Sequence, residues 1–351
     1  MKLFLSLLLI CTLTSFGQIL IKPTAKCFSY EGRFDFGTEA MARFSYSGST
    51  IYFTLDGSAV DLFLGTEKTN RNQVYYTILV NNKLYDVVKV TQTKRKYSLK
   101  LYTKGIYKVK IFKRTEAAVG TGLFYGVTPI DGKLIKNTPE FDVKLMVIGN
   151  SITCGYGNLF AFDPKKDNNQ HFTPANEDNY QSWATLLTNS LNAERHTIAF
   201  SGKGIYQNGN ESKTETMPQL FDFMNPFDTT VSWNHKNYQA NVIVINLGTN
   251  DFRDKNLEEA KFVSAYIDFV EKLKRLYPEA KIVCCSGPML GQALPKLRAC
   301  VKTVVYNFKK DVYAFEFAAQ KAPLGEDYHP NVHTHKTMAN NITPFIEGLL
   351  K

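Results

Sequence analysis

Cysteine and tryptophan are scarce in this sequence, and no cysteine pattern typical of a metal site occurs. Only 2 of the 351 residues are Trp, and the 6 Cys are at positions 11, 27, 154, 284, 285 and 300. None of them forms a Cys-x-x-Cys motif, and Cys284 and Cys285 are neighbours in an apparent strand, where their side chains point to opposite faces. Five cysteines follow residue 17, so at least one is unpaired. We therefore expect hydrophobic cores, rather than a disulfide framework, to hold the fold.

Long hydrophobic runs are also absent after the first 17 residues. Those residues contain one Lys, an apolar stretch from Leu3 to Leu13 and then small or polar residues, as a secretory signal peptide does. The stretch is too short to span a bilayer comfortably, and no later stretch is longer. We expect residues 1–17 to be a cleaved signal peptide, the protein to be secreted or periplasmic, and the chain to have no membrane span.

The sequence has no internal repeat and no strong compositional bias, which excludes a collagen, a coiled coil and a largely disordered chain. Its net charge of +10 is uneven: residues 24–140 contain 18 Lys and Arg against 10 Asp and Glu, whereas residues 141–351 contain 22 of each kind. A basic half could contact nucleic acid, an acidic polymer or an anionic surface, but we favour a solvated face. No nucleic-acid-binding motif is present, so nucleic acid is not an expected partner.

Residues 28–135 contain short runs of alternating side chains that are typical of strands. Examples are residues 43–46, 51–55, 74–80 and 105–111. Dipeptides typical of turns punctuate this region, namely Asp56-Gly57, Asn81-Asn82 and Asp131-Gly132. No helical periodicity interrupts the pattern. We therefore predict an all-β sandwich of the jelly-roll type over residues 18–137.

The second half alternates apolar strands with amphipathic helices. The predicted strands are residues 143–149, 197–200, 241–247, 281–285 and 312–315, and the clearest predicted helices are residues 178–191 and 257–276. This alternation predicts an α/β domain over residues 138–351, with a five-stranded parallel sheet in a three-layer, flavodoxin-like arrangement. Ligands of such sheets bind at the carboxyl ends of the strands, so the residues that follow each strand are the candidates for a site.

Those strand ends carry the side chains of an acyl-transfer site. Ser151, which follows the first strand, is a candidate nucleophile, and His329 is a candidate base. Asp327 could fix the histidine tautomer, while the N–H groups of Ser151 and Gly202 and the amide of Asn250 could bind an oxyanion. Each residue alone has a structural explanation, such as a helix cap or a turn, but the ordered set favours a catalytic site.

These segments resemble the SGNH (GDSL-type) hydrolase superfamily, whose blocks carry Ser, Gly, Asn and His in this order. The closer resemblance is to carbohydrate esterase family 2. It rests on residues 149–158 (GNSITCGYGN), 201–204 (SGKG), 242–252 (VIVINLGTNDF), 287–290 (GPML), 327–332 (DYHPNV) and 335–339 (HKTMA), and in the first half on 32–35 (GRFD) and 113–117 (KRTEA). The resemblance covers nearly the whole mature chain.

The resemblance implies an extracytoplasmic O-acetyl esterase that acts on plant polysaccharides such as xylan or glucomannan. Members of the family are noted for removing acetyl groups from the 6-position of hexose sugars. It also implies a jelly roll packed on the catalytic domain, and no metal or organic cofactor. We expect an acetylated polysaccharide or oligosaccharide as the substrate and a monomeric protein.

The resemblance leaves open which group orients His329. The superfamily pattern places a carboxylate three residues before the histidine, at Glu326, whereas the family pattern places it at Asp327, which we favour. Some family members hold the histidine with a backbone carbonyl, in which case neither carboxylate is essential. Asn150 stands where the family usually has Asp before the nucleophile, and we expect little loss from that change.

Two further questions stay open at the level of sequence. Phe252, Tyr156 and Tyr328 are candidates for stacking on a sugar ring, although each could instead belong to a core. The function also has two alternatives. A GDSL-type lipase or thioesterase would use the same chemistry but would need an extended apolar groove for a long acyl chain. A non-catalytic carbohydrate-binding protein is disfavoured by the intact catalytic set.

Overall fold

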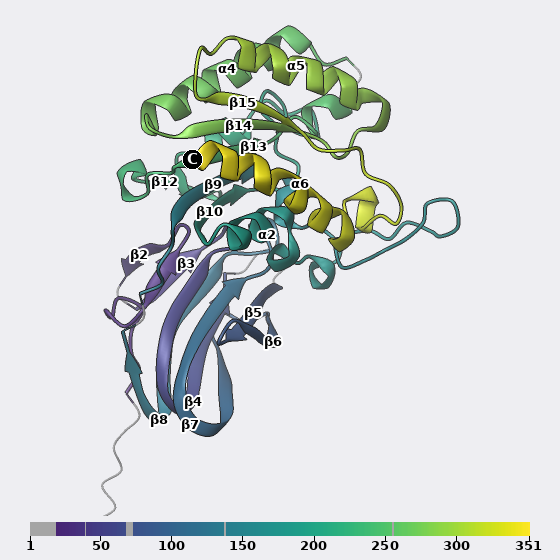
Figure 1. Ribbon diagram of the computed structural model, residues 1–351. Coiled ribbons are helices and arrows are strands. Elements are labelled where there is room, and N and C mark those ends of the chain that lie inside the picture. The colour runs from purple at the N-terminus through teal and green to yellow at the C-terminus, as the bar shows by residue number, and fades with distance from the viewer. Residues whose placement is uncertain (1–18, 39, 68–72, 137, 255) are drawn as a thin grey trace, which may run out of the picture.

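The structure is a computed structural model that describes residues 19–351 except 39, 68–72, 137 and 255. The predicted signal peptide, residues 1–17, lies outside the described residues. The chain forms two main sheets, one in each half, and they lie end to end in Figure 1. None of the helices in the described part of the chain is long and apolar enough to cross a membrane.

The first half forms one antiparallel sheet of eight strands, ordered β2-β3-β8-β4-β7-β5-β6, with β1 paired to β4. The strands are β1 (Ser29–Glu31), β2 (Asp35–Thr38), β3 (Met41–Phe44), β4 (Thr50–Thr66), β5 (Val74–Val80), β6 (Lys83–Val90), β7 (Arg95–Lys113) and β8 (Gly122–Ile135). Their inward side chains, such as Phe53, Ile78, Ile111 and Phe124, form one hydrophobic cluster. This burial explains the alternating pattern of the sequence.

Three strands of this sheet are much longer than the sequence predicted. β4 has 17 residues, β7 has 19 and β8 has 14. The predicted turns at Asp56-Gly57 and Asp131-Gly132 are wrong, because both dipeptides lie inside strands, where Gly57 of β4 pairs with Gly132 of β8. The register shifts beside Gly57, so the glycines form bulges that bend long strands. Asn81-Asn82 does form the predicted turn, with φ values of 51° and 63°.

The second half contains the predicted five-stranded parallel sheet, in the order β10-β9-β13-β14-β15. Its strands are β9 (Val143–Gly149), β10 (Ala193–Ala199), β13 (Val242–Asn246), β14 (Lys281–Ser286) and β15 (Val312–Glu316). Every residue of β13 is buried, as expected for a central strand that is covered on both faces.

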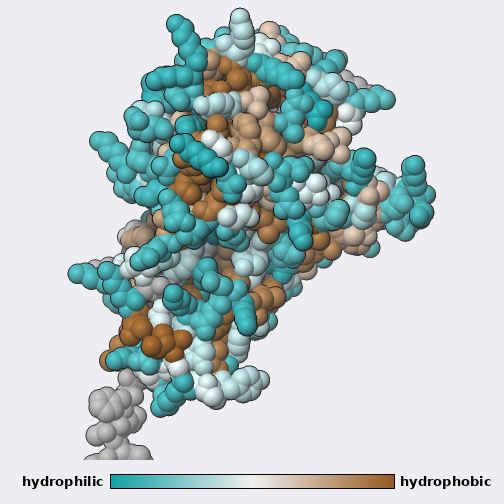
Figure 2. Space-filling view, in the orientation of Figure 1, coloured by the Kyte–Doolittle hydropathy of each residue, from teal (hydrophilic) through white to brown (hydrophobic). Residues whose placement is uncertain are grey.

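Helices cover both faces of this sheet (Figure 1). Met146 and Ile148 of β9 share a core with α4 (Glu259–Leu276) and α5 (Leu294–Tyr306), whereas Leu145 and Val147 share another with α2 (Trp183–Ser190) and α6 (Val332–Leu350). The helix expected over residues 178–191 begins only at Trp183, because Ser182 caps it and a 3-10 turn precedes it. Figure 2 shows the side of the molecule on which α2 and α6 lie, and polar side chains cover most of it.

Shorter elements lie in the connections. They are α1 (Ser151–Cys154), α3 (Met217–Leu220), the hairpin of β11 (Phe223–Asn225) and β12 (Asp228–Ser232), and 3-10 turns at Pro174–Asn176, Asn179–Gln181, His235–Asn237, Asp251–Arg253, Gly291–Ala293 and Glu326–Tyr328. Three of these elements, namely α1 and the turns at 251–253 and 326–328, adjoin the predicted site residues.

Buried charges join the two sheets. Glu31 of β1 lies against β10, where the Nη2 atom of Arg195 is 3.1 Å from Glu31 Oε2, and both side chains are almost fully buried. Nearby, Arg33 Nη1 donates to the carbonyls of Phe221 and Phe223, at 2.7 and 2.6 Å. The N-terminal sheet is thus fixed on the edge of the parallel sheet by directional contacts, which gives it a defined position beside the strand ends.

Candidate active site

Ser151 lies where the parallel sheet gives way to a helix. β9 ends at Gly149, and Asn150 caps α1 by accepting a hydrogen bond from the N–H of Ile152, at 3.1 Å. Ser151 is therefore the first residue of the helix. Its Oγ is 2.8 Å from the Nε2 atom of His329. The structure thus brings together two residues that are 178 positions apart in the chain.

The backbone sets the orientation of His329. Its Nδ1 atom lies 3.1 Å from the carbonyl oxygen of Glu326 and 3.2 Å from that of Asp327. A carbonyl only accepts, so Nδ1 must carry the proton, which leaves Nε2 free to accept the proton of Ser151 Oγ. Burial lowers the pKa of His329 to about 4, although the two carbonyls partly oppose the shift. The imidazole is therefore neutral at pH 7 and able to act as a base.

The prediction that the Asp327 carboxylate orients His329 is wrong in this structure. Asp327 Oδ2 accepts from the hydroxyl of Tyr156, at 2.8 Å, and from the N–H of Phe172, at 3.0 Å, while Oδ1 is 2.9 Å from His171 Nδ1. Asp327 and Tyr328 have φ values of 48° and 62°, and this tight turn presents backbone oxygens to the histidine. The carboxylate instead fixes the loop around residue 171.

Glu326 does not contact His329 through its side chain either. Its buried carboxylate accepts hydrogen bonds from the N–H of Thr173, at 2.9 Å, and from Asn176 Nδ2, at 2.7 Å. Of the three possibilities for orienting the histidine, the backbone carbonyl is the one that the hydrogen bonds of the described residues support.

The two other predicted residues lie beside this pair. Gly202 follows β10 with a φ of 80°, and Asn250 follows β13, where its Nδ2 donates to the carbonyl of Lys203, at 2.8 Å. Ser151, Gly202, Asn250 and His329 all line one cleft with a volume of about 980 Å³. The cleft is at the carboxyl edge of the sheet, as predicted for this topology.

The loop that carries Gly202 is held by a buried acid, Asp251. Its carboxylate accepts from the N–H groups of Ile205, Tyr206 and Gln207, at 2.8 to 3.1 Å. Burial raises the pKa of Asp251, and these hydrogen bonds oppose the shift. Asp251, the residue after Asn250, thus connects the loop that follows β10 with the loop that follows β13.

The three candidate aromatic residues have different positions. Tyr156 and Tyr328 line the cleft, and the Tyr156 ring stacks on the imidazole of His329, with centroids 4.2 Å apart. Tyr328 is 50% exposed and so is accessible to a ligand. The prediction of Phe252 as a sugar contact is wrong, because its ring is buried and packs edge-on against Phe262, at 5.1 Å, in the core under α4.

Sequence reasoning gave no role to one cleft residue from the N-terminal half. Glu116, in the loop after β7, lines the cleft and is buried. In the sequence, its segment, residues 113–117, carries only a family resemblance. The charged run Lys-Arg-Thr-Glu directly after a predicted strand was the one sequence feature that could have indicated a role. Nothing in that run shows that this segment contacts the catalytic loops.

A serine paired with a neutral histidine at the edge of a parallel sheet, beside a glycine and an asparagine, defines the class as serine hydrolases of the GDSL type. The model of the GDSL-like Lipase/Acylhydrolase family matches residues 147–336, and that of the Carbohydrate esterase 2 N-terminal domain matches residues 30–139. This chain belongs to family 2 of the carbohydrate esterases.

This chain is similar to a solved structure of the same family and to curated esterases. A family two carbohydrate esterase from Clostridium thermocellum, solved in complex with cellohexaose, is 32% identical, with a TM-score of 0.85 over 92% of this chain and 99% of that one. The cellulase/esterase CelE of Acetivibrio thermocellus is 34% identical over 92% of this chain, which spans only 39% of CelE. An acetylxylan esterase / glucomannan deacetylase of Cellvibrio japonicus is 23% identical, over 91% of this chain and 88% of that protein.

Proposed function

We propose that this chain is an O-acetyl esterase that removes acetyl groups from plant polysaccharides, with xylan, glucomannan and 6-O-acetylated hexoses as its substrates. The observation that carries the proposal is the 2.8 Å contact between Ser151 Oγ and His329 Nε2, in a cleft that Gly202 and Asn250 also line. The names of the relatives from Cellvibrio and Acetivibrio support the substrate class.

In the first half of the proposed reaction, His329 Nε2 accepts the hydroxyl proton while Ser151 Oγ attacks the acetyl carbonyl carbon. The carbonyl oxygen becomes an oxyanion, bound by the N–H groups of Ser151 and Gly202 and by the amide of Asn250. The imidazolium then gives its proton to the departing sugar hydroxyl. An acetyl ester of Ser151 remains.

In the second half, a water molecule takes the place of the sugar. His329 removes its proton as the water oxygen attacks the acetyl carbon, and the same donors bind the oxyanion again. Collapse of this intermediate breaks the bond to Ser151 Oγ, which recovers its proton from His329. The products are acetate and the free enzyme, and the reaction requires no metal or organic cofactor.

The lining of the cleft suits a hydroxyl-rich substrate. Besides the catalytic residues it includes the polar side chains of Asn169, His171, Thr249 and Arg253, and the apolar side chains of Ala118, Met289 and Leu290. A long acyl chain needs an extended apolar wall, so the acyl-length series described below tests the lipase alternative. Tyr156 and Tyr328 are the rings we propose as sugar contacts.

The remaining expectations are part of the same proposal. We propose that residues 1–17 direct export, which makes the protein secreted or periplasmic. Residues 18–137 and 138–351 form the two domains, in keeping with the positions of the two sheets. The protein acts as a monomer.

Acetate release from acetylated xylan and acetylated glucomannan tests the function. Wild type should release acetate, and Ser151→Ala should lose at least about 10³-fold in kcat, because the nucleophile is gone. Ser190→Ala, which changes an exposed serine of α2, is the matched control and should keep wild-type activity. Undiminished release by Ser151→Ala would refute the mechanism.

A series of nitrophenyl esters of increasing acyl length separates the substrate classes. Strong preference for acetate supports a deacetylase, whereas a preference for long chains would favour the lipase alternative. If wild type showed no Ser151-dependent hydrolysis of any ester, a carbohydrate-binding function would replace the enzymatic one.

A further inference from the structure

A loop of the N-terminal half enters the catalytic cleft. It follows β7, and its residues Glu116 and Ala118 line the cleft together with Ser151 and Gly202. Glu116 is only 1% exposed, and the buried Lys113 beside it donates to its backbone carbonyl, at 3.1 Å. The burial of this carboxylate therefore needs a functional or structural explanation, which its polar contacts supply.

Both oxygens of the Glu116 carboxylate bind Ser201, the residue before Gly202. Glu116 Oε2 accepts from the backbone N–H of Ser201, at 2.8 Å, and Oε1 accepts from the Ser201 hydroxyl. Two parallel hydrogen bonds from one residue fix both position and orientation. Glu116 thus holds the turn that carries the proposed oxyanion donor.

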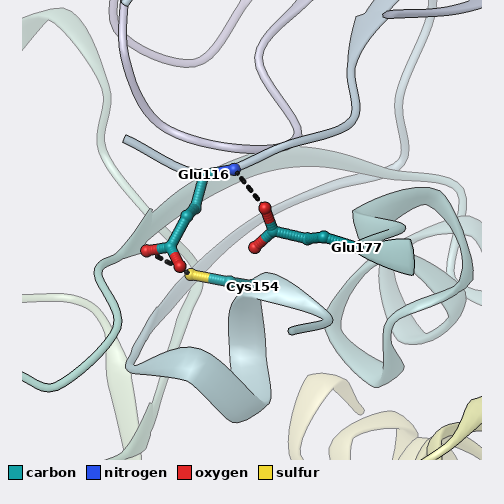
Figure 3. Close-up of side chains that lie close together, drawn as sticks. All are labelled: Glu116, Cys154 and Glu177. Carbon is teal, nitrogen blue, oxygen red and sulfur yellow. Dashed lines mark hydrogen bonds between the residues drawn. The ribbon is translucent and has the colours of Figure 1, made fainter. Parts of the chain in front are cut away.

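The same carboxylate contacts the helix of the nucleophile. The Cys154 Sγ atom, on α1 with Ser151, is 3.7 Å from Glu116 Oε2 (Figure 3). On its other side, the backbone N–H of Glu116 donates to Glu177 Oε2, at 3.1 Å. The carboxylate oxygens of Glu116 thus accept hydrogen bonds from Ser201 and contact Cys154, whereas Glu177 Oε1 is buried without a hydrogen-bond partner among the described residues.

Gly202 depends on its neighbours for its position. It has no side chain, its φ of 80° is in the left-handed region, and an added Cβ would meet no atom within 4 Å. The space at its Cβ position is therefore open. Its carbonyl accepts from the N–H of Gly209, at 2.8 Å, and Ser201 on its other side is held by Glu116.

We propose that Glu116 is a positioning residue for catalysis: through Ser201 it fixes the Gly202 N–H relative to Ser151, so that the N-terminal half completes the oxyanion site. The inference rests on the proposed esterase function. It predicts an effect on the transition state, where the oxyanion forms, and little effect on substrate binding.

Steady-state kinetics with 4-nitrophenyl acetate test this role in the full chain. The variants are Glu116→Gln, which keeps the shape but only one acceptor oxygen, Ser201→Ala, and the double variant. Each single change should lower kcat by about 10- to 100-fold and leave KM within about threefold. The kcat of the double variant should be no lower than that of the less active single variant, because both changes break the same contact.

Asp61→Asn is the matched control, since Asp61 is a buried acid of β4 that contacts Ser98 and Lys96 and is not among the residues that line the cleft. It should leave kcat within about threefold of wild type. Thermal unfolding of every variant separates loss of stability from loss of positioning. Inhibition by a small boronic acid, whose tetrahedral serine adduct places an oxygen among the oxyanion donors, should weaken in parallel with kcat.

Two results would overturn the inference: unchanged kcat in Ser201→Ala and Glu116→Gln, or equal losses in Glu116→Gln and Asp61→Asn that follow their unfolding temperatures. If Glu116→Gln fails to fold, Ser201→Ala decides alone. Wild type and Ser151→Ala are measured in the same assay. Absence of Ser151-dependent hydrolysis would refute the proposed function itself, whereas its presence with unaffected variants would refute only the role of Glu116.

Discussion

The side chain and the backbone of Asp327 have separate partners. Its carbonyl oxygen lies 3.2 Å from His329 Nδ1, whereas its carboxylate binds Tyr156, Phe172 and His171. Carbonyl acceptors suffice to fix the tautomer, but they supply less negative charge than a carboxylate for the imidazolium that forms during catalysis. The arrangement thus corresponds to a Ser–His pair oriented by the backbone.

Asp327→Asn should therefore have a small effect. We expect kcat to fall by less than about tenfold, compared with about 10⁴-fold where a carboxylate sets the tautomer of a catalytic histidine. His329→Ala, measured beside it, should lose nearly all activity. A loss of 10³-fold or more in Asp327→Asn would show that the carboxylate acts on His329 after all.

The pH dependence of kcat/KM reports the histidine directly. His329 must be neutral to accept the proton of Ser151, so activity is lost as pH falls through its pKa. Since burial lowers that pKa to about 4, kcat/KM should be constant between about pH 7 and 5 and decline only below that range. An acid limb with its midpoint near the ordinary histidine value of 6.5 would contradict the environment described here.

At the scale of elements, paired glycines decide the shape of the N-terminal sheet. Gly57 in the middle of β4 pairs with Gly132 of β8 and with Gly105 of β7. A Cβ on Gly57 would lie 2.0 Å from the carbonyl oxygen of Asp131, which is backbone and cannot move aside alone. β4 and β8 can therefore approach this closely only because Gly57 and Gly132 have no side chains.

Gly57→Ala should destabilise the protein by about 2 kcal/mol, because the strands must separate to admit the methyl group. Gly348→Ala is the matched control: an added Cβ meets nothing within 4 Å in α6, and alanine is the better helix former. The control should be unchanged or more stable by at most about 1 kcal/mol. Equal free energies of unfolding for the two variants in urea would refute the close approach of β4 and β8 at Gly57.

At the scale of the whole molecule, the two halves are joined by buried charges. The Glu31–Arg195 ion pair lies between β1 and β10, and Arg195 Nη2 also binds the carbonyl of Gly48 and the hydroxyl of Thr50, each at 3.1 Å. A buried pair with such supporting hydrogen bonds costs much to break, because the remaining charge stays desolvated. The joint therefore couples the unfolding of the two sheets.

Glu31→Gln should lower the free energy of unfolding by about 3 kcal/mol. Glu258→Gln, which removes an exposed partner of Lys261, should change it by less than about 1 kcal/mol. We also expect calorimetry to show a single transition in wild type and a broadened or divided one in Glu31→Gln. Indistinguishable unfolding curves for the two variants would contradict a structural role of the joint.

Much of the fold followed from local patterns. The five parallel strands were predicted because unbroken apolar runs are typical of strands buried on both faces, and β13 is such a strand. The long antiparallel strands were not predicted. Asp-Gly favours a turn locally, but in β4 and β8 the same dipeptide forms a bend within a strand. Pairing with the partner strand keeps the dipeptide within a strand there.

The sequence by itself determined which residues gather at the sheet edge. Ser151, Gly202 and Asn250 each follow a parallel strand, and the carboxyl ends of such strands meet wherever the helices lie. Only the tertiary structure decided three other points: the orientation of His329 by carbonyls, the burial of Phe252, and the contact of Glu116 with Ser201. The physical reason is that local periodicity predicts which segments are strands and which residues follow them, whereas each of these contacts depends on the exact path of a loop or on segments far apart in the chain.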